Sequence, residues 1–96
     1  PFSMLAFLFL LFALQDDLAV GQRALARGDY PAAEAAFQRH LARFPESGEA
    51  LSNLAVVFSR RGQTVEAIEL YRRALKHSPK LIPVHFNLAV ALLQTK

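Results

Sequence analysis

The chain repeats itself with a period of thirty-four residues, and this self-similarity constrains its fold more than any other feature. The string Asn-Leu-Ala-Val occupies 53–56 and returns at 87–90. The same displacement aligns several further pairs: Arg27-Gly28 with Arg61-Gly62, Ala33 with Ala67, Phe37 with Tyr71, Arg39 with Arg73, Leu41 with Leu75, and Pro45 with Pro79. An ungapped period of this length predicts stacked copies of one supersecondary unit. We therefore predict a first unit over 14–47, a second over 48–81, and the first helix of a third over 82–96.

Each complete unit is predicted to be a pair of helices. In the second unit, apolar residues recur at helical spacing before Gly62, and they do so again before Pro79. Glycine supplies the positive φ that a helix C-terminus often needs, and proline cannot continue a helix. Ser47 is a candidate N-cap for the helix that follows it. The small residues that would let paired helices approach closely are Gly21, Ala33, Ala55 and Ala67.

These residues resemble the tetratricopeptide repeat, a helix-turn-helix unit of the same period. The second unit matches at Leu54, Ala55, Phe58, Gly62, Ala67, Tyr71, Ala74 and Pro79. The first unit matches at Val20, Gly21, Gly28, Ala33, Phe37 and Pro45, and the third at Asn87, Leu88, Ala89 and Leu92. The resemblance spans 14–96 and implies an all-α solenoid of about 2.5 repeats. His40 departs from the pattern, because a small residue is usual at its position.

The resemblance also implies a concave groove, lined by the first helices of successive units, that binds an extended peptide or a helix of a partner protein. The expected groove residues are Gln22, Ser52, Asn53, Val56, Arg60, Phe86, Asn87 and Val90, with Leu18 and Leu25 beside them. The two asparagines could bond a partner's backbone, or they could simply face water. Some family members clamp the terminal carboxylate of chaperones with basic residues. Pro83 and Asn87 stand where those residues are needed, so we do not expect that partner.

Residues 1–14 differ sharply from the remainder, because twelve of the fourteen are apolar and none is charged. As a helix they would span about 21 Å, which is short of a bilayer core of roughly 30 Å. An apolar run of this length suits a secretory signal. We therefore expect an apolar N-terminal helix that is either a signal peptide or a membrane anchor, with membrane association through residues 2–14. The protein is then extracytoplasmic (periplasmic or secreted) or membrane-anchored, and its excess of arginine over lysine favours a bacterial source.

No catalytic, cofactor or metal-binding set is expected. The absence of cysteine excludes a disulfide framework and a thiolate zinc site. The three histidines, at 40, 77 and 85, are not spaced as a metal site, and no phosphate-binding or nucleophile motif occurs. A net charge of +3 does not indicate a nucleic-acid partner. The pairs Arg60-Arg61 and Arg72-Arg73, with Lys76 and Lys80, are interpreted as a solvated face; an acidic protein or anionic lipid is the alternative.

The segment 82–93 is apolar on nearly every side, whereas a solenoid normally ends with a helix whose outer face is polar. We therefore expect the chain to be a fragment that is cut within its third unit. Two alternatives to a pure interaction scaffold follow from this. The repeats could position an enzyme or transport component, or the 82–93 face could mediate self-association.

Overall fold

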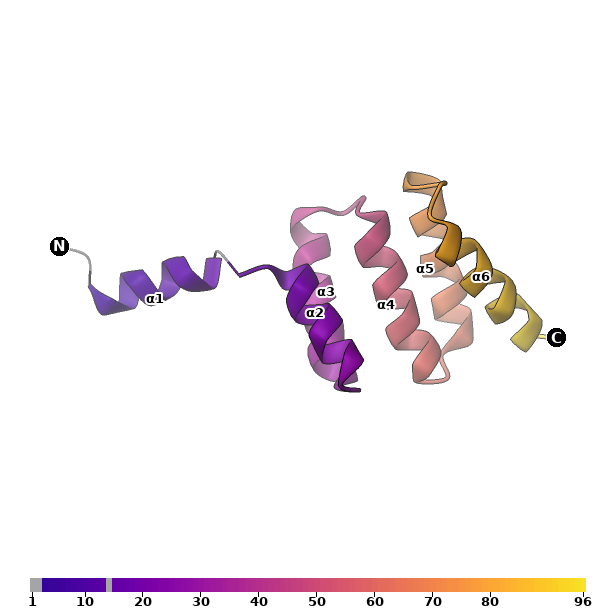
Figure 1. The fold of residues 1–96 in the computed structure, drawn as a ribbon, viewed down its shortest axis with the longest axis horizontal. Coiled ribbons are helices and arrows are strands. Elements are labelled where there is room, and N and C mark those ends of the chain that lie inside the picture. The colour runs from indigo at the N-terminus through magenta and orange to yellow at the C-terminus, as the bar shows by residue number, and fades with distance from the viewer. Residues whose placement is uncertain (1–2, 14) are drawn as a thin grey trace.

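The computed structural model describes residues 3–13 and 15–96, and the regular elements of this part are all α-helices. Helices α2 and α3 form one antiparallel pair, α4 and α5 form a second, and α6 lies against α5 (Figure 1). The all-α helix-turn-helix architecture predicted from the repeat is therefore confirmed. The helices are α1 (Met4–Ala13), α2 (Asp17–Ala26), α3 (Tyr30–Arg43), α4 (Gly48–Arg60), α5 (Thr64–His77) and α6 (Ile82–Gln94).

Two glycines make the tight turns within the helix pairs, as the repeat predicts. Gly28 has φ +78 and follows α2, and Gly62 has φ +80 and follows α4. Nothing lies within 4 Å of the position that a Cβ would occupy at either glycine, so space does not dictate the residue type. The left-handed backbone does, because glycine adopts it without the steric penalty of a side chain.

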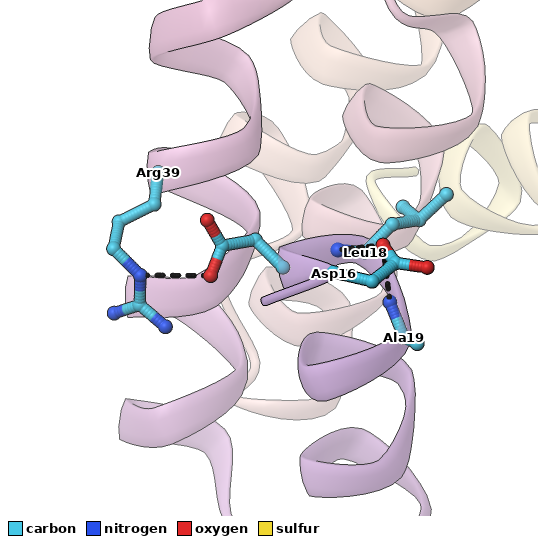
Figure 2. A network of polar contacts seen from close by, with 5 residues as sticks. Asp16, Leu18, Ala19 and Arg39 are labelled. Atoms are coloured by element: carbon cyan, nitrogen blue, oxygen red, sulfur yellow. Dashed lines mark hydrogen bonds and ion pairs between the residues drawn. The ribbon is translucent and has the colours of Figure 1, made fainter. Parts of the chain in front are cut away.

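Side chains cap the N-termini of α2, α3 and α4. The Ala50 N–H donates to Ser47 Oγ at 3.2 Å, which confirms the predicted cap of α4. At α2, Asp16 Oδ1 accepts from the N–H groups of Leu18 and Ala19 (Figure 2). These bonds satisfy donors that have no partner within the helix.

An ion pair fastens the two helices of the first unit beside that cap. Arg39 Nε, on α3, donates to Asp17 Oδ1, on α2, at 3.0 Å (Figure 2). The Asp17 side chain is only 15% exposed, so this pair is better shielded from water than most surface pairs. The second unit places Leu51 at the position equivalent to Asp17, and this apolar side chain is fully buried in the core cluster.

The core runs as a continuous cluster through both helix pairs, and its small residues lie where the repeat predicts. Ala33, Ala55 and Ala67 are fully buried, as is the ring of Phe37. Gly21 faces that ring so closely that a Cβ would lie 2.6 Å from Phe37 Cδ1 and 2.8 Å from Cζ. Close approach of α2 to α3 therefore depends on the missing side chain of Gly21.

His40, the departure from the repeat pattern, does not disturb this core. Its ring lies 5.0 Å from the ring of Phe44, centroid to centroid, at the end of α3. His40 is half-buried and Phe44 is 50% exposed, so the pair lies at the surface of the first unit and outside its buried core.

Helix α1 extends away from the packed helices along the long axis of the molecule (Figure 1). Five of its apolar residues expose more than half of their surface: Met4, Leu5, Phe7, Leu8 and Leu10. Among the described residues, no helix has the combined length and apolar character that crossing a bilayer requires.

Candidate functional site

A hollow of about 310 Å³ lies between α4 and α6, and we call it the α4–α6 groove. It brings together five of the eight residues that the sequence nominated, which are Val56, Arg60, Phe86, Asn87 and Val90. Four further residues line it: Ser59, Tyr71, Ala91 and Gln94. A larger hollow of about 430 Å³ runs along the outer side of α5, but a single helix supplies its lining. The α4–α6 groove is the better candidate because three helices converge on it.

The thirty-four-residue period explains why these side chains share one face. Helices α4 and α6 are the first helices of successive units, so equivalent positions point the same way. Val56 and Val90 are one such pair, and Arg60 and Gln94 are another. Stacking two copies of the same helix therefore builds a continuous surface from residues that are distant in sequence.

The other three nominated residues lie outside this hollow, and two of them already have partners within the protein. Gln22 Nε2 donates to Glu49 Oε1 at 3.3 Å, which joins α2 to α4. Ser52 Oγ donates to the Glu49 carbonyl oxygen at 2.9 Å. Asn53 differs, because its Nδ2 atom is buried and has no hydrogen-bond partner among the described residues.

Leu18 and Leu25, which were expected beside the groove, are not among the residues that line the α4–α6 groove. Leu25 is 9% exposed and belongs to the core, and Leu18 is half-buried and packs against the same cluster. Both residues are on α2, whose apolar side is turned toward the neighbouring helices. Full burial of an aliphatic side chain contributes about 1.5–3 kcal/mol to the free energy of unfolding, which favours packing of these leucines in the core.

Tyr71 is the lining residue that sequence reasoning assigned to packing alone. It does pack, because it is only 3% exposed, and an edge of the residue also reaches the groove. Burial raises the pKa of its phenol, and the positive charge of Arg60 acts in the opposite direction. The available signal was the change from Phe37 to Tyr71 between equivalent positions, which adds a hydroxyl group.

The stacked helix pairs and the groove between their first helices define this chain as part of a helical-repeat solenoid. The family model of the tetratricopeptide repeat matches residues 18–82, which is more than half of the chain. The chain therefore belongs to the tetratricopeptide-repeat family, a non-catalytic repeat fold that is generally used for protein interaction. A search of curated proteins gives no match. Within the part that the structure describes, no cluster of His, Cys, Asp and Glu could hold a metal ion.

Proposed function

We propose that this repeat segment is an interaction scaffold that binds a peptide or a helix of a partner protein in the α4–α6 groove. The observation that carries the proposal is Phe86, which is 70% exposed although it lines a hollow beside polar groups. Large exposed aromatic residues next to a few convergent polar groups are typical of binding sites. Burial of this ring by a partner supplies affinity, and Asn87 and Arg60 supply orientation.

The buried amide of Asn53 supports the same proposal. A buried donor without a partner costs about 1–3 kcal/mol, which is recovered if the Asn53 side chain turns outward beside the groove and donates to a carbonyl oxygen of the bound chain. Asn87 occupies the equivalent position one unit later and lines the groove. Two amides at repeat-equivalent positions suit the regularly spaced carbonyl groups of a partner backbone.

Selection of random short peptides displayed on phage tests the proposal and does not require the partner to be identified first. Peptides enriched on the intact chain should lose binding to Phe86→Ala and keep binding to Val65→Ala. Val65 is a matched control because it is also 70% exposed, but it lies on α5, outside the α4–α6 groove. Equal binding of the enriched peptides to both variants would contradict the proposed site.

We further propose that residues 1–14 direct the protein out of the cytoplasm, either as a cleaved signal peptide or as a retained membrane anchor. The uncharged apolar composition of this segment and the exposed side chains of α1 support the proposal. Expression of the full-length protein in a bacterium, followed by fractionation and intact-mass measurement, separates the two possibilities. A soluble species trimmed near 13–15 indicates a cleaved signal, and an untrimmed species in the membrane indicates an anchor. An untrimmed species in the cytoplasm would contradict both.

A further inference from the structure

The α4–α6 groove contains one charged group among its lining residues, the guanidinium of Arg60. Ion pairs in the described part of the chain engage Arg27, Arg39 and Arg61, and none of them engages Arg60. Arg60 is exposed at the end of α4, and the other groove residues are neutral. The groove therefore presents a cation without a counter-charge, which is complementary to an anion on a partner.

The first unit shows that the fold does not require this charge. A shift of thirty-four residues places Ala26 at the position of Arg60, Phe37 at that of Tyr71, and Ser52 at that of Phe86. Helix α2 still ends in the same way, with the glycine turn after it. The cation, the phenol and the exposed ring are thus all particular to the α4–α6 groove, although the two units share one scaffold.

Arg60 and Tyr71 can act on the same ligand group. The two residues line one hollow, and the charge of Arg60 is felt at the Tyr71 phenol, where it lowers the pKa against the effect of burial. A guanidinium and a phenolic O–H are both hydrogen-bond donors, and a carboxylate is the acceptor that pairs best with such a set. Asn87 adds an amide donor on the opposite wall, on α6.

Apolar surface lies directly beside these donors and continues past them. Phe86 and Val90 line the groove, and Ile82 precedes Phe86 by four residues on the same helix. Residues four apart lie on one face of a helix, so the three form an apolar stripe along α6. The stripe extends beyond the hollow, so a partner chain can pass through it and need not end there.

We propose that the α4–α6 groove accepts an internal Asp or Glu side chain of a partner segment, next to an apolar side chain of the same segment. Arg60 and Tyr71 bind the carboxylate, and Phe86 and Val90 cover the apolar neighbour. This inference rests on the proposed function, because it names the chemistry of the ligand that the same groove would take. An acidic residue flanked by an apolar one is thus the sequence feature that partners should share.

Adjacent arginines offer a matched test. Arg61 Nη1 donates to Glu34 Oε2 at 2.9 Å, and Arg61 does not line the groove. Arg61→Gln therefore removes the same charge as Arg60→Gln but leaves the groove residues unchanged. The probes are end-blocked synthetic peptides that carry Phe-Glu or Phe-Gln at their centre, together with a third set that carries Phe-Gln and a free C-terminal carboxylate. Binding is measured by fluorescence polarisation, and circular dichroism confirms that both variants are folded.

We expect the Phe-Glu peptides to bind about tenfold more tightly than the Phe-Gln peptides, the lower range for a hydrogen bond to a charged group. Arg60→Gln should abolish this preference, and Arg61→Gln should leave it within about twofold. Ultraviolet titration should show a higher Tyr71 pKa when the Phe-Glu peptide is bound, with Tyr71→Phe identifying the signal. The variant is needed because the chain has a second tyrosine, Tyr30, which also contributes to the ultraviolet signal.

Three results would overturn the inference, and they differ in what they leave standing. Equal binding of Phe-Glu and Phe-Gln peptides would refute carboxylate recognition while leaving the groove as a peptide site. Preference for the free C-terminal carboxylate would replace the internal acidic residue with a chain end. Loss of the preference in both arginine variants would indicate a general effect of net charge. Failure of every peptide to bind, together with failure of the phage selection, would instead count against the proposed function itself.

Discussion

Replacing Gly21 with alanine tests the closest helix contact in the core. The added Cβ would lie 2.6 Å from Phe37 Cδ1 and 2.8 Å from Cζ, distances at which either the ring or α2 must move. The ring is fully buried, so it has no open space into which it can turn. Overpacking of a core typically costs about 1–3 kcal/mol, and alanine recovers about 1 kcal/mol of helix propensity relative to glycine. Because the clash involves several ring atoms, we expect a net loss of about 1–2 kcal/mol in the free energy of unfolding.

Urea denaturation followed by circular dichroism measures this loss, and a double-mutant cycle with Phe37→Leu identifies its cause. Phe37→Leu removes the ring atoms that meet the new Cβ, so Gly21→Ala should be nearly neutral or stabilising in that background. The two substitutions should therefore show a coupling energy of about 1–2 kcal/mol, within the range for residues in contact. Unchanged or increased stability of the single Gly21→Ala variant would refute the reasoning. It would mean that α2 can move away from α3 without cost. The second unit already carries an alanine, Ala55, at the position equivalent to Gly21.

Three further predictions concern Tyr71 and Asn53. Tyr71→Ala should lower the free energy of unfolding by about 3–5 kcal/mol, because the side chain is only 3% exposed; a loss under about 1 kcal/mol in a chemical melt would sink the packing interpretation. The pKa of Tyr71 is raised above its ordinary 10.0 in the folded state, so the folded chain holds that proton more tightly. The contribution of the protonated Tyr71 phenol to the free energy of unfolding should thus be fully present below pH 10 and be lost as the pH rises through the raised pKa. Tyr71→Phe should therefore reduce the decline of thermal stability at alkaline pH. Asn53→Ala should leave thermal stability equal or slightly higher, since it removes an unpaired buried donor, and should weaken binding of the selected peptides; unchanged affinity would return Asn53 to a passive role.

The fold was predictable because its determinants are local and repeated. Glycine at 28 and 62 and proline at 45 and 79 mark where helices stop, and each depends on backbone conformation that a single residue imposes. The Ser47 cap also depends on one side chain and a backbone N–H three residues away. Signals of this kind do not depend on the remainder of the chain.

The candidate site was predictable only in part, because exposure of a side chain depends on how the helices cross. Val56 and Phe86 line the same hollow, since the period places both on the faces of successive first helices. Leu25 is instead buried in the core cluster. Gln22 bonds to Glu49 on α4, and Ser52 bonds to Glu49 on its own helix. None of these outcomes is encoded in the spacing of a single helix.

The sequence by itself determined that this chain is a stack of helix pairs, that helices stop before Gly28, Pro45, Gly62 and Pro79, that one starts after Ser47, and which positions are small. These properties follow from short-range sterics and hydrogen bonding, and the repeat displays them twice. The tertiary structure decided that Tyr71 serves both the core and the groove. Among the described residues, it also decided that Asn53 Nδ2 is buried without a hydrogen-bond partner, and that Arg61 meets a carboxylate while Arg60 does not. These properties depend on distances between helices, which arise only when the side chains of neighbouring units pack against one another.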